Sequence, residues 1–278
     1  MNTAEVSATI GVLGLGAMGR PIVGHLLAAG HKVLVHDLDP ATVADAVGAG
    51  AVAAATPAEV GRGVAAVLVI VPTDADVTSI CLGAAGVLPA LAPGAVLFVC
   101  SSVLPATCQA LAAARPPGTH VLDAALTGGV RAAENGTINL LVGGEQAGLD
   151  RGRWAVAPWT SGVHLLGALG AGQVAKTANN LIHWAQVCAI HEAFDLAGRF
   201  GLDIAALRAA LLQGPTESRA MRDLELMRYT WYAKDLANAF VMAAEAGADL
   251  PVARTSEAVM PSITVARMHA LLAGDAGL

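Results

Sequence analysis

Lys176 and Asn180 stand four residues apart in a segment where Gly167, Gly170 and Gly172 alternate with small residues. On a helix, a four-residue spacing places both side chains on the same face. The neighbouring residues are small or apolar, which predicts partial burial of this face. Burial lowers the pKa of an amine towards the range that is useful for proton transfer. The segment therefore predicts a helix that carries a general acid/base.

The use of lysine in the rest of the chain supports a chemical role for this residue. The chain has only three lysines, Lys32, Lys176 and Lys234, and its other basic residues are arginines. An amine can release its proton near neutral pH, whereas a guanidinium cannot. The alternative interpretation is an ordinary surface lysine.

A second glycine-rich segment, Gly14-x-Gly16-x-x-Gly19, lies between a predicted strand at Thr9–Leu13 and a helix that runs to about Ala29. In this context the first glycine makes a tight turn, the second lets the backbone approach a pyrophosphate, and the third lets helix and strand pack closely. The free N–H groups at the start of the helix would then bind the anion. The alternative is a structural turn without a ligand.

Asp37 indicates which dinucleotide would bind. It follows Gly14 by 23 residues, close to the roughly 20 at which an acidic residue accepts hydrogen bonds from the adenine ribose. Its carboxylate and that of Asp39 would repel a 2′-phosphate, and no arginine occurs between Asp37 and Arg62. The sequence therefore predicts NAD as the cofactor rather than NADP.

Composition narrows the class of protein. The 278 residues are 55% hydrophobic and 14% charged, and the formal net charge is −6. This charge, without any basic run, argues against a nucleic-acid partner. The cysteines form no Cys-x-x-Cys pair and no cluster with metal-ligand spacing, so we expect reduced, buried thiols and no metal site. They are Cys81, Cys100, Cys108 and Cys188.

The sequence also predicts a cytoplasmic protein without a membrane segment. Glu5 stands near the start of the chain and no basic n-region is present, so no signal peptide is expected. The uncharged stretch from Val77 to Ala114 is interrupted by glycines and prolines. It therefore does not predict a membrane-spanning helix.

The first half of the chain alternates short apolar runs with helical patterns, and Thr56-Pro57-Ala58-Glu59 has the order of a helix N-terminus. Near-continuous apolar strands between helices are typical of a parallel sheet covered on both faces. We therefore predict an α/β Rossmann-type dinucleotide-binding domain with a parallel-rich sheet over residues 1–166. Its expected strands are Thr9–Leu13, Val33–His36, Val67–Val71, Ala95–Val99, Val121–Ala125 and Leu140–Gly143.

After Gly172 the strand pattern ends, and residues 167–278 are expected to form an all-helical domain for substrate binding and oligomerisation. The long first helix predicts a homo-oligomer, either a homodimer or a homotetramer. The expected helices are Gln173–Phe200, a helix capped by Asp203 that ends at Gln213, then Glu217–Arg228, Ala233–Ala246 and Pro251–Ala273.

With these features in place, the chain resembles the β-hydroxyacid dehydrogenases, a family that includes 3-hydroxyisobutyrate dehydrogenase and tartronate semialdehyde reductase. The resemblance covers nearly the whole chain and depends on four separate motifs. They are Gly14–Gly19 followed by Arg20-Pro21, Asp123–Val130 continuing into Gly136-Thr137 and Val142–Gly144, Gly170–Asn180, and Lys234-Asp235-Leu236.

The resemblance implies a role for each matching residue. Lys176 would be the general acid/base and Asn180 would orient the substrate. Thr127, together with the backbone of Gly128 and Gly129, would bind the substrate carboxylate, although the family usually has serine where Thr127 stands. The residues implied to line the cofactor are Gly14, Leu15, Gly16, Ala17, Met18, Gly19, Asp37, Val71, Pro72, Asp76, Ser102 and Lys234.

Two stretches of the sequence each allow two interpretations. The segment Ser218–Tyr232 is rich in Met and aromatic residues, Trp231 among them, and forms either helix core or a wall of the substrate pocket. His183 and Trp184 follow Asn180 by one helical turn, so either could contact the substrate or serve packing alone.

The predicted function is NAD-dependent interconversion of a 3-hydroxy carboxylic acid and its semialdehyde or ketone by hydride transfer. Two alternatives remain at this point: an imine reductase on the same fold, and a dinucleotide-binding protein without turnover. Because relatives of both kinds tend to lack the catalytic lysine, Lys176 favours the dehydrogenase.

Overall fold

A computed structural model describes residues 8–274. The expectation drawn from Glu5, that the chain has no signal peptide, lies outside these residues. The chain divides into two compact units, one ending at Lys176 and the other beginning at Thr177. Each unit has its own hydrophobic core.

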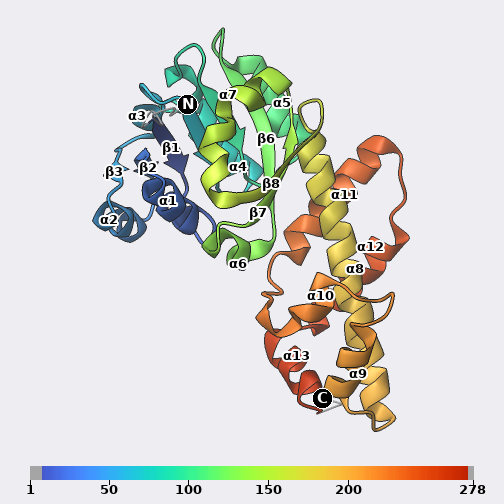
Figure 1. Cartoon of the computed structure of the whole chain (residues 1–278). Coiled ribbons are helices and arrows are strands. Elements are labelled where there is room, and N and C mark those ends of the chain that lie inside the picture. The colour runs from blue at the N-terminus through green and yellow to red at the C-terminus, as the bar shows by residue number, and fades with distance from the viewer. Residues whose placement is uncertain (1–7, 275–278) are drawn as a thin grey trace, which may run out of the picture. The chain divides into compact units, whose positions relative to one another are not determined.

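The first unit contains an eight-stranded sheet with the order β3-β2-β1-β4-β5-β6-β7-β8 (Figure 1). Neighbouring strands are parallel except β6 and β7, which pair antiparallel. The parallel-rich Rossmann-type sheet predicted from the sequence is therefore confirmed, with two strands, β3 and β8, added to the six expected. The strands are β1 Thr9–Leu13, β2 Lys32–His36, β3 Val52–Ala53, β4 Ala66–Val69, β5 Val96–Val99, β6 His120–Thr127, β7 Ile138–Gly143 and β8 Thr160–Gly167.

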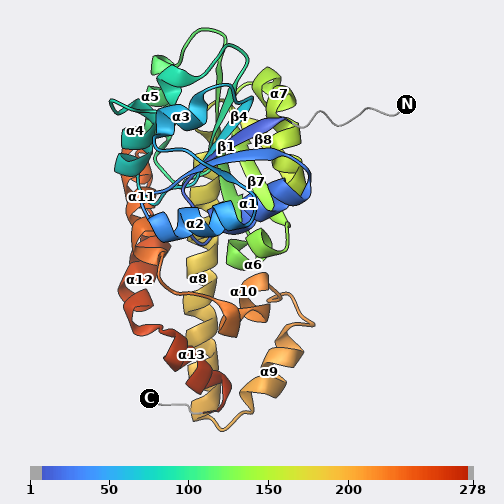
Figure 2. The ribbon, with the colours of Figure 1, turned by 90° about the vertical axis from the view of Figure 1, so that its left-hand side faces the viewer.

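Helices cover both faces of this sheet (Figure 2). In β4, Ala66 and Leu68 belong to one buried cluster, whereas Val67 and Val69 belong to the other. Because successive side chains of a strand point to opposite faces, a strand buried on both sides is apolar throughout. The helices of this unit are α1 Gly19–Ala28, α2 Pro40–Gly48, α3 Pro57–Gly61, α4 Asp74–Leu82, α5 Pro105–Ala114, α6 Gly129–Glu134 and α7 Gln146–Val156.

The second unit consists of helices joined by loops, with no strand among its described residues, as predicted. Its longest helix, α8, spans Ala171–Arg199 and begins in the first unit. The prediction of continuous helices over residues 217–228 and 251–273 is wrong, because a short 3-10 turn interrupts each of them. Pro261 lies in the second of these turns, where its ring lacks the N–H that a continuing helix needs. The remaining helices are α9 Ile204–Leu211, α10 Arg219–Arg222, α11 Tyr232–Ala246, α12 Pro251–Val259 and α13 Val265–Leu272.

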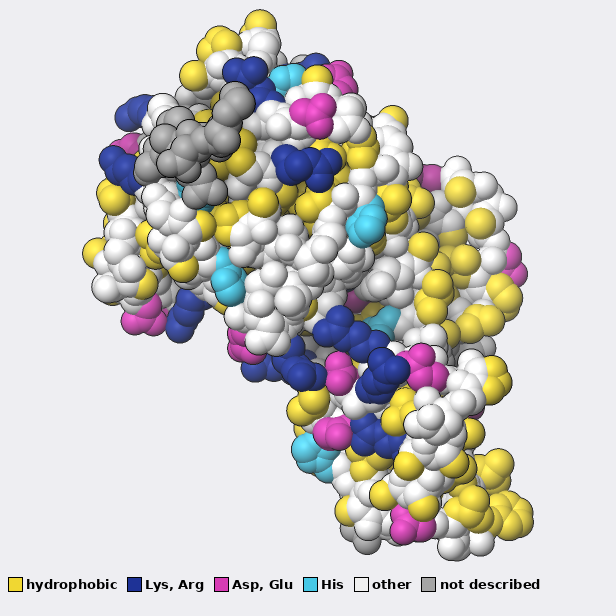
Figure 3. All heavy atoms as spheres, viewed as in Figure 1, with side chains coloured by type: hydrophobic (Ala, Val, Ile, Leu, Met, Phe, Trp, Pro, Cys, Tyr) yellow, Lys and Arg dark blue, Asp and Glu magenta, His cyan; other side chains and the backbone are white. Residues whose placement is uncertain are grey.

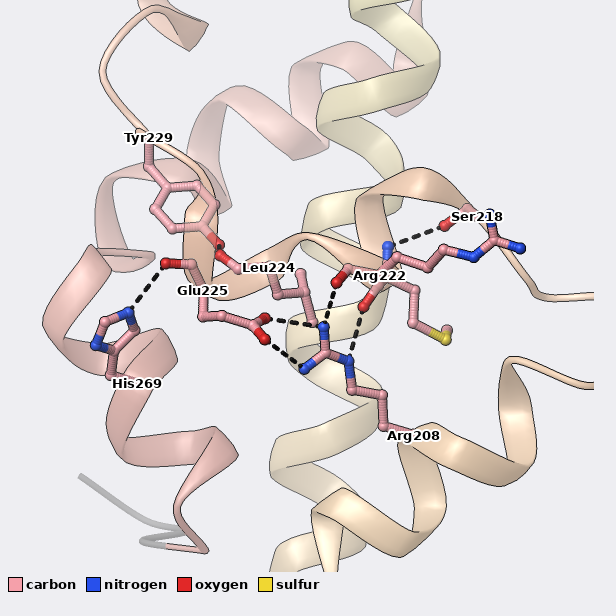
Figure 4. A network of polar contacts seen from close by, with 8 residues as sticks. Arg208, Ser218, Arg222, Leu224, Glu225, Tyr229 and His269 are labelled. Carbon is pink, nitrogen blue, oxygen red and sulfur yellow. Dashed lines mark hydrogen bonds and ion pairs between the residues drawn. The ribbon is translucent and has the colours of Figure 1, made fainter. Parts of the chain in front are cut away.

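A polar network built on Arg208 organises the segment 218–232 (Figure 4). The Arg208 guanidinium donates to the carbonyl oxygens of Met221 (2.8 Å) and Arg222 (2.6 Å) and pairs with the Glu225 carboxylate at 2.8 Å. The Tyr229 hydroxyl donates to the Leu224 carbonyl at 2.6 Å. Met221, Leu224 and Tyr229 are buried in the core of the unit, so this part of the segment is helix core. The exception is Trp231, which is 43% exposed.

Candidate active site

Five parallel strands, β2, β1, β4, β5 and β6, end at the same edge of the sheet. The strand order reverses direction at β1, and in sheets of this kind ligands bind beyond the carboxyl ends of the strands at this reversal. The sequence-predicted residues of the first unit follow these strand ends. They are Gly14–Gly19 after β1, Asp37 after β2, Val71 and Pro72 after β4, Ser102 after β5, and Thr127–Gly129 at and after the end of β6.

The turn between β1 and α1 has the geometry of a dinucleotide-binding turn. Gly14 has a left-handed backbone (φ 96°), and its N–H donates to the His36 carbonyl at 3.0 Å. A Cβ on Gly14 would collide with the Ile70 carbonyl, and one on Gly19 with the Gly14 carbonyl. Around Gly16, by contrast, no atom lies within 4 Å of a Cβ. The fold itself thus requires glycine at positions 14 and 19. Gly16 faces free space, where the pyrophosphate of a ligand could approach.

The start of α1 is suited to an anion. Met18 at the N-cap makes no side-chain capping bond, and the first turn has no acidic residue. The N–H groups and dipole at a helix start favour a negatively charged group when no side chain caps them. The residues present therefore fit a pyrophosphate.

Asp37 is held in one orientation by two backbone donors. Its carboxylate accepts hydrogen bonds from the N–H of Leu15 at 2.6 Å and of Asp39 at 2.9 Å. The Leu15 bond ties the glycine turn to the end of β2. A half-buried carboxylate fixed in this way retains lone pairs for the hydroxyls of a ribose.

The loops after β4 and β5 are joined through Ser101. The Val71 N–H donates to the Ser101 hydroxyl oxygen at 2.8 Å, and this hydroxyl donates to the Val69 carbonyl at 3.3 Å. Asp76 forms a capping box at the start of α4, where its carboxylate accepts from the N–H (3.1 Å) and hydroxyl (2.7 Å) of Thr73. The Asp76 carboxylate thus caps a helix, a role different from the predicted lining of the cofactor.

The segment Thr127–Gly129 combines a buried hydroxyl with two exposed glycines. The Thr127 hydroxyl donates to the Asn139 carbonyl across the β6–β7 pair at 2.7 Å, so its proton is used within the sheet. Gly128 and Gly129 both have positive φ, 108° and 70°, and lie at the start of α6. Exposed backbone N–H groups at a helix start form a site suited to a carboxylate.

Lys176 and Asn180 lie one turn apart on α8, as predicted. Lys176 is half-buried, and Asn180 is only 7% exposed. The Asn179 amide donates to the Asn180 side-chain oxygen at 3.1 Å, leaving the Asn180 amide group with its own N–H donors. The prediction that this helix places an amine and an amide on one partly buried face is confirmed.

Further along α8, an aromatic cluster fixes the start of α11. Trp184 is buried, lies 4.6 Å from the ring of His183, and meets Tyr232 edge-on at 6.3 Å. Its indole N–H donates to the Asp235 carboxylate at 3.1 Å. Trp184 therefore belongs to the core of the helical unit. Through this bond Asp235 positions the first turn of α11, on which Lys234 is half-buried.

The cysteines do not provide a reactive thiol. All four cysteines are free and buried, and burial raises the pKa of the Cys81 thiol to about 12, which keeps this thiol protonated and unreactive. Within residues 8–274, no group of three His, Cys, Asp or Glu side chains is placed to hold a metal ion. No helix in the same range is long and apolar enough to cross a membrane.

A dinucleotide-type turn with a fixed acidic residue, followed by a helix with an amine and an amide, defines an oxidoreductase with an NAD(P)-binding domain. Comparison with known proteins gives the family. Residues 9–167 match the NAD binding domain of 6-phosphogluconate dehydrogenase, and residues 170–272 match the domain described as NAD-binding of NADP-dependent 3-hydroxyisobutyrate dehydrogenase. The chain belongs to the 3-hydroxyisobutyrate dehydrogenase family of β-hydroxyacid dehydrogenases.

Individual relatives agree with this assignment. A 3-hydroxyisobutyrate dehydrogenase from Pseudomonas aeruginosa is 37% identical over 205 residues, 73% of this chain and 69% of the relative. An NAD-dependent L-serine dehydrogenase from the same organism is 34% identical over 199 residues, 71% and 67% of the two chains. The structure of Mycobacterium tuberculosis 3-hydroxyisobutyrate dehydrogenase with L-serine superposes with a TM-score of 0.84 at 27% identity, covering 96% of this chain and 99% of the other.

Proposed function

We propose that this protein is an NAD-dependent dehydrogenase that interconverts a 3-hydroxy carboxylic acid and its semialdehyde or ketone. Residues 1–166 would bind the dinucleotide, and residues 167–278 would serve substrate binding and assembly. The observation that carries the proposal is the pairing of Lys176 with Asn180 on one partly buried helix face in a chain of this family. Lys176 also argues against the imine reductase and non-catalytic alternatives.

In the proposed reaction, a bound nicotinamide supplies the hydride acceptor. Oxidation of the alcohol also releases a proton from the substrate oxygen, and the Lys176 amine accepts that proton. The Asn180 amide orients the hydroxyl, and the N–H groups of Gly128 and Gly129 bind the carboxylate. Thr127 supports this turn through its bond to Asn139, and its hydroxyl oxygen can still accept a hydrogen bond.

The chemistry of the relatives' substrates supports a 3-hydroxy acid. The relatives are named for 3-hydroxyisobutyrate and L-serine. In both molecules the hydroxyl is on the carbon next to the one that bears the carboxylate. If the Gly128–Gly129 turn binds this carboxylate, the matching alcohol without a carboxylate should have a kcat/KM at least about tenfold lower, the scale of one lost charge-assisted hydrogen bond. Equal turnover of the acid and the uncharged analogue would contradict the assignment.

We further propose NAD as the preferred cofactor, because the fixed Asp37 carboxylate would repel a 2′-phosphate. Asp37→Ala should lower kcat/KM for NAD. The ratio of kcat/KM with NAD to kcat/KM with NADP should fall by roughly tenfold, which corresponds to the loss of about one charge-assisted hydrogen bond. Steady-state kinetics with both cofactors measures this gap. A wild-type enzyme that works better with NADP would refute the proposal.

We also propose that the protein forms a homodimer or homotetramer through α8. Val174, Ile182 and Leu196 on α8 are between 51% and 62% exposed, and at 3.6 residues per turn they fall on one face of the helix. Phe200, directly after the helix, is 78% exposed. Figure 3 shows hydrophobic side chains gathered on the surface of the helical unit where α8 ends in Figure 1. Exposed apolar side chains that form a stripe on one helix face, here with the exposed Glu192 among them, indicate an interface between protein chains.

Placing a charge in this stripe should weaken the assembly. Ile182→Glu should shift the protein towards monomers in analytical ultracentrifugation at micromolar concentration, because a buried, unpaired carboxylate opposes association. Val47→Glu on α2, at a side chain that is 45% exposed, is the control and should leave the assembly unchanged. A wild-type monomer under the same conditions would exclude the proposed oligomer.

A further inference from the structure

Asp123 is a charged residue enclosed in the middle of β6, and its side chain is fully buried. Its two carboxylate oxygens accept hydrogen bonds from the N–H of Gly170 at 2.6 Å and of Gln173 at 2.8 Å. Burial raises the pKa of Asp123, and the bonds from Gly170, Gln173 and Gly172 oppose this rise. The carboxylate therefore serves the first turn of α8, although it lies about 50 residues earlier in the chain.

This arrangement replaces a local helix cap. The residues before α8 are Gly167-Ala168-Leu169-Gly170, which have no side chain able to accept from the free N–H groups of the first turn. A Cβ on Gly143 or Gly172 would collide with the Asp123 carboxylate. These glycines therefore make room for an anion that belongs to the chain itself.

Gln173 extends the same contact to the loop after β5. Its side chain is 1% exposed, its amide nitrogen donates to the Ser101 carbonyl at 2.9 Å, and its amide oxygen accepts from the Val103 N–H at 3.1 Å. The two bonds flank Ser102, a proposed cofactor-lining residue. One turn of α8 is thus bonded both to β6 and to a loop of the proposed dinucleotide site.

We propose that Asp123 and Gln173 are positioning residues for the reaction: together they fix the first turn of α8, and with it Lys176 one turn further on, relative to the loop that carries Ser102. The inference depends on the proposed role of Lys176 as the proton acceptor. A proton transfer requires the two groups within hydrogen-bond reach, and a misplacement of about 1 Å can lower the rate 10²-fold. The effect of losing this contact should therefore fall on kcat.

The test compares Asp123→Asn, which keeps the shape but removes the charge and one acceptor, with Gln173→Met, which keeps the volume but removes both bonds. Each should lower kcat roughly 10- to 100-fold, with KM and NADH affinity within about threefold of wild type and a larger solvent isotope effect. Amide hydrogen exchange should rise in residues 101–104 and 170–177. Asp203→Ala, which removes the N-cap of α9 where Asp203 accepts from the N–H of Ala206, is the control and should lower Tm without changing kcat.

Three results would overturn the inference. Wild-type kcat in both variants, or unchanged exchange in residues 170–177, would reduce the contact to ordinary packing. A loss of NADH affinity as large as the loss of kcat would place Asp123 in cofactor binding instead. A wild-type protein without dehydrogenase activity would contradict the proposed function. Hydrogen exchange would still test the contact in that case.

Discussion

Lys176→Ala is expected to lower kcat by roughly 10²–10⁴-fold, the usual effect of removing a positioned acid/base. The half-buried Lys176 lies on the second turn of α8, one turn before the buried Asn180. Without the amine, the proton of the substrate hydroxyl has no positioned acceptor. NADH affinity, which depends on the Gly14–Gly19 turn and Asp37, should change little, and fluorescence titration can measure it separately.

Lys176→Arg distinguishes proton transfer from a simple need for positive charge. A guanidinium remains protonated at accessible pH, so this variant should be nearly as impaired as the alanine variant. The pH profile of kcat/KM for oxidation should rise with pH as the wild-type amine loses its proton, and this limb should vanish in both variants. Near wild-type kcat in either variant would return Lys176 to a structural role.

Gly16→Val is expected to weaken NADH binding roughly 10- to 100-fold while leaving stability unchanged. The protein has no atom within 4 Å of a Cβ at Gly16, and the residue has no left-handed backbone, so the fold accepts a side chain there. A pyrophosphate approaching the turn would meet it, and steric overlap of this kind costs about 1–3 kcal/mol. Fluorescence titration with NADH and thermal unfolding measure the two effects.

Gly24→Val provides a matched control on the same segment. Gly24 also has no atom within 4 Å of a Cβ, but it lies in the middle of α1, away from the helix start. The Gly24→Val variant should bind NADH with the affinity of the wild type. If Gly16→Val bound NADH normally, the dinucleotide would not approach the Gly14–Gly19 turn.

The elements that the sequence predicted best are those whose pattern is set by full burial. β1 has the predicted bounds, Thr9–Leu13, because an apolar run closed by a glycine turn has few alternatives. β8 was missed because it lies at the sheet edge and most of its side chains remain partly exposed, so its sequence lacks a continuous apolar run. The break between α12 and α13 was missed although Pro261 could have indicated it.

The position of a candidate site residue was predictable wherever it follows from the end of a strand or from the spacing along a helix. The glycine turn, Asp37 and the Lys176–Asn180 pair are of this kind. The role of Asp123 was not, because it depends on pairing between segments about 50 residues apart. The Thr127 hydroxyl bond to Asn139 likewise depends on the β6–β7 register, which the sequence does not specify.

The most direct test of the account is NADH formation from NAD and a panel of 3-hydroxy carboxylic acids with side chains of graded size, using wild-type protein and Lys176→Ala in parallel. We expect steady turnover of at least one acid by the wild type, and a kcat roughly 10²–10⁴-fold lower in the variant. A wild-type protein that binds NADH but oxidises none of these acids, or a variant as active as the wild type, would contradict the proposed dehydrogenase mechanism.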